Sequence, residues 1–239
     1  MDKYILETKA LNKYFGKQLA VNNISLKVRE GSIYGLLGPN GAGKSTTLKT
    51  ITGLLHATRG EILIDGNKWN RKQLENIGAL IEAPAIYGNL SARDNLRVHT
   101  KLMNIPESRI DEVLKIVDLT DTGKKKSSQF SLGMKQRLGI AIALLGKPKL
   151  LILDEPTNGL DPIGIQELRA LIKSFPKQGI TVIISSHILS EVQHTAEYVG
   201  IINNGQLKYE GKIDENIDLE SLFMKVVMGD SRGGSTLNA

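Results

Sequence analysis

One short stretch constrains this chain more than any other. Residues 38–46 read Gly-Pro-Asn-Gly-Ala-Gly-Lys-Ser-Thr and fit the pattern G-x-x-x-x-G-K-[ST], which is typical of a phosphate-binding loop. The apolar run 33–37 before the loop predicts a buried strand, and residues 46–55 after it have apolar side chains at helical spacing. A strand, a glycine-rich loop and a helix surround one point with backbone N–H groups and the positive end of a helix dipole. The stretch therefore predicts a site for a nucleoside triphosphate.

Within this loop, two side chains have specific expected roles. The Lys44 ammonium is expected to reach the β- and γ-phosphates, and the Ser45 hydroxyl is expected to bind Mg²⁺. The loop does not say what the energy of the nucleotide is used for. The other residues expected to surround the phosphates are Gly38, Asn40, Gly41, Ala42, Gly43 and Thr46.

Length and composition limit the class of protein. The 239 residues suffice for one large α/β domain or for a core with a subdomain. The chain has no cysteine, which excludes a disulfide framework and a thiolate metal site and agrees with a cytoplasmic location. It shows neither a signal-peptide pattern nor a run near the ~20 apolar residues of a membrane span. If the protein serves a membrane, other chains are expected to cross it.

The net charge of +6 would suit an anionic membrane surface or a nucleic acid. A plainer explanation is that scattered surface lysines and the charge of a bound nucleotide account for it, and we favour that explanation. Charge alone therefore does not identify a partner.

Strand signals occur in both halves of the chain. Ile5, Leu6 and Leu11 indicate a first strand and residues 20–28 a second, with a turn at 14–17 between them. An exposed aromatic in that turn would be able to stack on a nucleotide base, and packing against the core is the alternative. Later strands are expected at 60–66, 77–81, 150–153 and 181–187 and in a hairpin at 198–210.

Polar residues follow three of the predicted buried strands, at the strand ends where α/β proteins place their ligand sites. Asp154 is expected to hold Mg²⁺, and Glu155 to accept a proton from an attacking water. His187 is expected to contact phosphate. Glu82 is a plausible active-site residue, with a solvated strand end as the alternative.

Strand signals are absent from about residue 84 to residue 145, and helical spacing replaces them, which predicts a helical insertion in an α/β core. Ser91 and Asp94 are placed as a capping box. Ser131 is placed to cap a helix that runs through Leu144, and the start of that helix is either an anion site or an ordinary capped helix. Residues 229–235 are expected to form a disordered tail.

The motifs now form an ordered set. A phosphate loop at 38–46, a Ser-x-Gly helix start at 131–133, a strand followed by Asp-Glu at 150–155, Gly-Leu-Asp at 159–161 and a strand-end His187 resemble the nucleotide-binding subunit of ABC transporters. The resemblance covers nearly the whole chain. Any one motif is moderately specific, and all of them in this order are highly specific.

The resemblance implies further residue roles. Phe15 matches the aromatic that stacks on the adenine of ATP, with Tyr14 as the neighbouring alternative. Ser131 and Gly133 match the signature that contacts the γ-phosphate bound to the opposite subunit, and Asp161 matches the loop that couples the two sites. The implied mechanism is a head-to-tail dimer that sandwiches two ATP molecules, in which closure drives membrane partners and hydrolysis resets them.

The implied fold is α/β, with a P-loop NTPase (RecA-like) core, an antiparallel β subdomain and an inserted α-helical subdomain. The expected bounds are 1–82 and 146–215 for the core with its β subdomain and 83–145 for the helical insertion. Residues 216–239 are expected to form a C-terminal helix and a flexible tail. The implied catalytic residues are Glu155, His187 and Lys44, and the implied Mg²⁺ ligands are Ser45, Glu82 and Asp154.

Two departures from the family pattern narrow the assignment. The usual signature Leu-Ser-Gly-Gly-Gln is replaced by residues 130–134, Phe-Ser-Leu-Gly-Met, which keep the serine and the glycine of Ser-x-Gly. The usual loop glutamine is replaced by Glu82, a stronger ligand for Mg²⁺ that also repels phosphate. Both features are similar to the ATPases of bacterial lantibiotic-immunity and bacitracin-resistance exporters, and so is the segment 218–223.

The resulting hypothesis is an ATPase that powers export of a peptide antibiotic through separate transmembrane permease subunits. The resemblance implies a peripheral location at the inner face of the cell membrane, a homodimer, only indirect contact with the peptide, and no nucleic-acid partner. A heterodimer, another exported substrate, a soluble ABC protein acting on ribosomes or DNA, and a module that binds ATP without hydrolysis remain alternatives. A single set of motifs argues against the soluble class, and the presence of Glu155 and His187 argues against the non-hydrolysing module.

Overall fold

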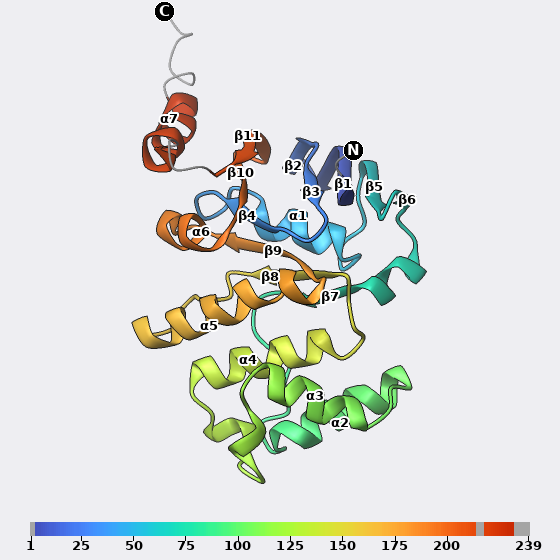
Figure 1. Cartoon of the computed structure of the whole chain (residues 1–239). Coiled ribbons are helices and arrows are strands. Elements are labelled where there is room, and N and C mark those ends of the chain that lie inside the picture. The colour runs from blue at the N-terminus through green and yellow to red at the C-terminus, as the bar shows by residue number, and fades with distance from the viewer. Residues whose placement is uncertain (1–2, 214–217, 232–239) are drawn as a thin grey trace, which may run out of the picture. The chain divides into compact units, whose positions relative to one another are not determined.

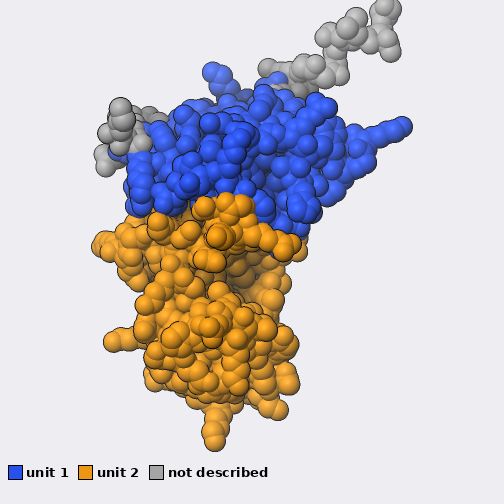
Figure 2. Space-filling model, turned by 90° about the vertical axis from the view of Figure 1, so that its right-hand side faces the viewer, with its two compact units in different colours: residues 1–69, 183–239 blue, residues 70–182 orange. Residues whose placement is uncertain are grey.

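Strands and helices alternate along the chain in the computed structural model, which describes residues 3–213 and 218–231 (Figure 1). Two units are distinguished in Figure 2. The first unit combines the described parts of 1–69 and 183–239, and the second is 70–182. The α/β class with antiparallel and parallel sheets confirms the fold class expected from the sequence.

An antiparallel sheet contains most of the N-terminal strands of the first unit. Its strand order is β2-β1-β5-β6, and β3 also pairs with β1. This sheet is the predicted antiparallel β subdomain. Its strands are β1 (Tyr4–Phe15), β2 (Gln18–Ile24), β3 (Lys27–Arg29), β5 (Arg59–Ile64) and β6 (Asn67–Lys68).

The strand predicted over residues 20–28 is divided into β2 and β3. The buried Thr8 hydroxyl donates to the Ile24 carbonyl and accepts the Leu26 N–H, each at 3.0 Å. Asn23 has a φ of 55°, outside the extended region. The chain therefore bends here, because a side chain replaces the strand ladder as the hydrogen-bonding partner.

The second sheet of the first unit carries the phosphate loop. In this sheet β4 lies between β10 and β9; it pairs in parallel with β10, which forms the predicted hairpin with β11. Leu37, Val192 and Ile201 belong to the apolar cluster that packs helices against it. The elements are β4 (Ile33–Leu37), β9 (Thr181–Ser186, in this unit from Ile183 onward), β10 (Tyr198–Asn203), β11 (Gln206–Lys212), α1 (Lys44–Ile51), α6 (Leu189–Thr195) and α7 (Leu219–Ser231).

The second unit is mainly helical. Strands β7 (Ile77–Leu80) and β8 (Leu150–Asp154) pair in parallel, and between them the described chain forms only the isolated bridge Ser91–Lys126 and no further strand. Helices α2, α3 and α4 pack on one another, as Figure 1 shows. The helices are η1 (Arg71–Asn76), α2 (Ala92–Met103), α3 (Ser108–Ile116), η2 (Thr120–Thr122), η3 (Ser127–Gln129), α4 (Leu132–Leu144), α5 (Pro162–Ser174) and η4 (Pro176–Gln178).

Two helix ends differ from the sequence-based expectation. Helix α1 ends at Ile51 rather than at Leu55, because Gly53 follows in a left-handed conformation with a φ of 75°. Leu54, expected on the apolar face, is 64% exposed. Helix α7 continues through Ser231, so the first residues of the expected disordered tail are helical, and the rest of that tail lies outside the described residues.

None of the helices in 3–213 and 218–231 is long and apolar enough to cross a membrane.

Candidate nucleotide site

The phosphate loop follows β4, whose residues are all buried. A Cβ on Gly38 would lie 2.3 Å from the Ile202 carbonyl oxygen, and one on Gly43 would lie 2.6 Å from that of Ala20. Gly43 also has a φ of 103°. Gly38 is therefore required for close packing, and Gly43 is required both for close packing and for its backbone conformation.

The Lys44 side chain folds back over the loop. Its ammonium group donates to the carbonyl oxygens of Gly38 at 2.8 Å and Pro39 at 3.3 Å, and the residue is 6% exposed. The Ala42 N–H donates to the Pro39 carbonyl at 3.1 Å, within the turn of the loop. The positive charge of Lys44 is thus held at the loop. The Ala42 N–H, one of the backbone groups expected to face a phosphate, is bonded within the loop.

The start of α1 is suited to an anion. Its N-cap is Gly43, which has no side chain to accept the first helical N–H groups, and its first turn contains no acidic residue. Ser45 and Thr46 lie half-buried in this turn. The partial positive charge of a helix N-terminus is concentrated in the first turn, where a phosphate would receive it.

The aromatics at the end of β1 are accessible. Phe15 is 46% exposed and Tyr14 is 40% exposed, so neither is a core residue. Phe15 pairs with Gln18 across the β1–β2 turn, and the same hairpin contains Ala20, whose carbonyl faces Gly43. The hairpin therefore connects the exposed rings to the phosphate loop.

A hydrogen bond from the buried Tyr34 side chain holds the strand that leads into the loop. The Tyr34 hydroxyl donates to Glu210 Oε1 at 2.7 Å, and the Lys27 N–H donates to the same oxygen at 2.9 Å. Burial, together with the Glu210 charge, raises the pKa of the Tyr34 phenol well above its ordinary value. One carboxylate of β11 thus fixes β3 and β4, and no local sequence pattern predicts this contact.

His187 follows the last residue of β9 and is half-buried. Strand β9 hydrogen-bonds with β4, the strand that ends in the phosphate loop. The Ser186 hydroxyl accepts the Ile188 N–H on the far side of His187 and donates to the Glu191 carboxylate; neither Ser186 nor Glu191 was expected from the sequence to have a role. The first unit thus contains Phe15, the loop and His187.

The carboxylates lie in the second unit. Asp154 is the last residue of β8 and is 3% exposed, and Glu155 follows it half-buried with a φ of 50°. Glu82 is exposed, beyond the end of β7, with a φ of 62°. A positive φ is uncommon for residues other than glycine and is often found at functional sites.

The signature segment forms the start of α4. Ser131 is the N-cap, and its hydroxyl oxygen accepts the Met134 N–H at 3.2 Å, which confirms the predicted cap. A Cβ on Gly133 would meet nothing closer than 3.9 Å. Asp161 caps α5 through the Gly164 N–H at 2.7 Å, and Pro162 occupies the first turn.

No group of three or more His, Cys, Asp or Glu residues within the described ranges is arranged to hold a metal ion.

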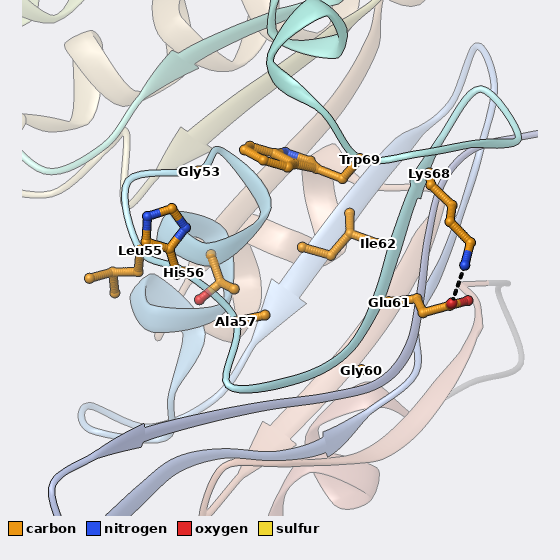
Figure 3. A pocket seen from close by; sticks show the side chains of 10 residues that line it. Gly53, Leu55, His56, Ala57, Gly60, Glu61, Ile62, Lys68 and Trp69 are labelled. Atoms are coloured by element: carbon orange, nitrogen blue, oxygen red, sulfur yellow. Dashed lines mark hydrogen bonds and ion pairs between the residues drawn. The ribbon is translucent and has the colours of Figure 1, made fainter.

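A separate pocket of about 240 Å³ lies at the C-terminal end of α1, as Figure 3 shows. The Trp69 indole forms one wall, and its N–H donates to the Ile51 carbonyl at 3.0 Å. A Cβ on Gly53 would lie 2.4 Å from this ring. Lys68 and Glu61 form an ion pair at the rim, at 2.7 Å. The predicted site residues do not line this pocket, and its indole wall supports the turn that ends α1.

Comparisons with known proteins agree with this geometry. The model of the family described as ABC transporter matches residues 21–158. The lantibiotic transport ATP-binding protein SrtF of Streptococcus pyogenes is 50% identical over 228 residues, which are 95% of this chain and 100% of that protein. The bacitracin transport ATP-binding protein BcrA of Bacillus licheniformis is 51% identical over 215 residues, 88% of this chain and 70% of the relative.

Among solved structures, the chain is similar to the dimeric ATP-binding cassette MJ0796 in a post-hydrolysis state bound to ADP and Pi. The TM-score is 0.76 and the identity is 27%, over 87% of this chain and 99% of that one.

Proposed function

The chain belongs to the ABC transporter family and is one of its ATP-hydrolysing subunits, and on that basis we propose that it powers export of a peptide antibiotic through separate transmembrane subunits. The similarity to SrtF over the full length of that protein is the observation that carries the proposal. The similarity to BcrA supports the same class of substrate. The protein is placed by this proposal at the inner face of the cell membrane, bound to its permease partners.

Nucleotide binding rests on the first unit. Phe15 stacks on the adenine, and Lys44 and the N–H groups at the start of α1 hold the phosphates. Exposure of Phe15 and burial of Lys44 against the loop support these roles. Backbone atoms contribute to phosphate binding at Asn40, Gly41, Ala42 and Thr46.

Ser45 in the first unit, and Asp154 and Glu82 in the second, each offer an oxygen of the kind that Mg²⁺ prefers. Asp154 is the last residue of a buried strand, at the end of the strand where α/β proteins place their ligand sites, and this position supports the role. Bound with ATP, Mg²⁺ neutralises charge on the phosphate oxygens. Glu82 carries the full charge that a glutamine at this position would lack.

Hydrolysis requires a base and groups that hold the γ-phosphate. Glu155 accepts a proton from the attacking water, and His187 contacts the γ-phosphate. The strained backbone of Glu155 and the half-buried state of its side chain support a role for which the residue must be held in one orientation. Catalysis is then mainly positioning and charge neutralisation.

The working unit is a head-to-tail dimer of two copies of this chain. Ser131 and Gly133 contact the γ-phosphate bound to the opposite copy, and Asp161 couples the two sites. The MJ0796 cassette is dimeric in its post-hydrolysis state, and its similarity to this chain supports the arrangement. The Ser131 cap supports it as well, because the serine hydroxyl is held at the helix start.

Replacement of the base tests the hydrolytic role. Glu155→Gln is expected to leave ATP binding intact and to lower steady-state turnover by about 10²–10⁴-fold, because the amide cannot accept the proton. The matched control is Glu167→Gln, which changes an exposed glutamate on α5. Unchanged turnover in Glu155→Gln would remove this residue from the role of base.

Isolation from native membranes tests the transport role. After gentle detergent extraction, mass identification is expected to recover multi-span subunits with this chain. Cells that carry only Glu155→Gln are expected to lose resistance to a lantibiotic or to bacitracin. Recovery of ribosomes or nucleic acid without a membrane protein would overturn the transporter proposal and leave the ATPase.

A further inference from the structure

The backbone on both sides of His187 is held by one buried side chain. Ser186, the last residue of β9, is 2% exposed, and its hydroxyl oxygen accepts the Ile188 N–H at 2.9 Å. The same hydroxyl donates to Glu191 Oε2 at 2.8 Å in a buried contact. The bond between the Ser186 hydroxyl and the Ile188 N–H spans His187, and the bond to Glu191 holds the Ser186 hydroxyl in place. The backbone of His187 therefore has little freedom while both bonds persist.

Glu191 is itself fixed. It is 7% exposed and lies in the first turn of α6, where a carboxylate is favoured by the helix dipole, and its N–H donates to the Ile188 carbonyl at 3.2 Å. A hydrogen bond to a charged carboxylate is roughly twice as strong as one between neutral groups.

Helix α6 in turn packs on the strand that supports the phosphate loop. A Cβ on Gly35 of β4 would lie 2.3 Å from Val192 Cγ1, so the helix and strand are in direct contact beside Glu191. Val192 and Leu37, the last residue of β4, belong to the same buried apolar cluster. A continuous set of contacts therefore connects β4, α6, Glu191, Ser186 and His187 within the first unit.

We propose that Ser186 and Glu191 are positioning residues that hold His187 relative to the strand of the phosphate loop. This inference rests on the proposed contact of His187 with the γ-phosphate. A catalytic group displaced by about 1 Å loses up to 10²-fold in rate, because only a narrow range of geometries is productive. This clamp, the hydrogen-bonded pair Ser186 and Glu191, acts on the rate of turnover and not on the affinity for ATP. Lys44 and the phosphate loop bind the nucleotide without it.

The test is a double-mutant cycle in steady-state ATP hydrolysis by the full chain. Ser186→Ala is expected to lower kcat on the order of tenfold while KM for ATP stays within about twofold. Ser186→Thr, which keeps the hydroxyl, is expected to restore most of the rate. In a His187→Ala background, Ser186→Ala is expected to have no further effect, because the residue that it positions is absent.

Ser32→Ala is the matched control. It removes another buried hydroxyl of the same unit, which donates to the Arg29 carbonyl at 2.8 Å, and it should leave kcat unchanged. If His187→Ala lowers kcat but Ser186→Ala does not, or if the two effects multiply, the clamp is refuted and the proposed function stands. If His187→Ala leaves kcat unchanged, the role of His187 and the clamp both fail.

Discussion

Two helices begin at positions that the sequence predicts to be anion sites, and they are built differently. Helix α1 begins at Gly43, which offers no side chain to its first N–H groups, whereas α4 begins at Ser131, whose own hydroxyl accepts the Met134 N–H. A helix start without a side-chain cap leaves N–H groups for water or a ligand, and a capped start is stable by itself. The difference supports the proposed phosphate role of α1, and it gives α4 a stable end whether or not a phosphate approaches it.

The glycines at the two starts differ in the same way. Gly43 has a φ of 103° and close backbone neighbours, whereas Gly133 is helical and a Cβ there would make only ordinary contacts, the nearest at 3.9 Å. The first glycine is required by the fold of the loop. Gly133 leaves space at the start of α4, and this space has a use only if a ligand or another chain approaches the helix there.

The largest expected change in ATP binding comes from removing the positive charge at the start of α1. Lys44→Ala is expected to weaken ATP binding by about 10²-fold, because a buried ammonium that pairs with phosphate is removed. Equilibrium titration with a fluorescent ATP analogue measures the loss. Lys49→Ala, in the last turn of the same helix, is the control and should bind normally. Normal affinity in Lys44→Ala would contradict the loop assignment.

The next largest effect is expected when Gly43 and Gly133 are each replaced by alanine. Gly43→Ala is expected to destabilise the fold by about 1–3 kcal/mol and to weaken ATP binding less than Lys44→Ala does, because its Cβ would overlap the Ala20 carbonyl. Gly133→Ala should leave stability and ATP binding unchanged and lower only turnover. Thermal unfolding and nucleotide titration measure both variants. Equal destabilisation by the two would remove the distinction between the helix starts.

Substitutions of the capping serine separate its two roles. Ser131→Ala is expected to cost about 1 kcal/mol of stability and to reduce turnover. Ser131→Asn keeps a good N-cap, so stability should recover while turnover stays low. Ser91→Ala, which removes the cap of α2, is expected to lose similar stability with normal turnover. If Ser131→Asn restored turnover, the serine would be a cap and nothing more.

A smaller effect concerns the unit that carries α4. In the described chain, Nε2 of His99 on α2 is buried without a hydrogen-bond partner, and burial lowers the pKa of this imidazole below 6.5. The unfolded state then binds the proton more readily, so stability is constant above about pH 6.5 and falls as the pH drops below it. His99→Phe should reduce that fall, as measured by denaturant unfolding at pH 5 to 8. An identical pH profile in the variant would exclude His99 as its source.

The phosphate loop and the helix caps could be predicted because their signals are local. Ser131 and Asp94 act within three or four residues, and the loop glycines serve a backbone shape that the motif itself encodes. The helical insertion was predictable for the same reason, since the spacing of apolar residues changes from strand to helix. From the turn alone, Phe15 was expected either to stack on a base or to pack against the core, and its exposure shows that it is not a core residue.

Long-range contacts could not be predicted in this way. Thr8 divides the second strand through bonds to residues 24 and 26, and Glu210 fixes Tyr34 across 176 positions. The left-handed Gly53 ends α1 before its apolar pattern ends, and the space that it leaves is filled by Trp69. The Ser186–Glu191 contact is short in sequence but depends on how α6 packs on Gly35, which no local pattern states.

The central claim is that α1 of one copy and α4 of another act on the same nucleotide, and mixing two inactive variants tests it most directly. Lys44→Ala lacks a working loop, and Ser131→Arg lacks a working signature. In a head-to-tail dimer of one copy of each, one site combines the intact loop of one variant with the intact signature of the other. We predict that the mixture hydrolyses ATP although neither variant does so alone. A mixture no more active than the sum of its parts would contradict the account.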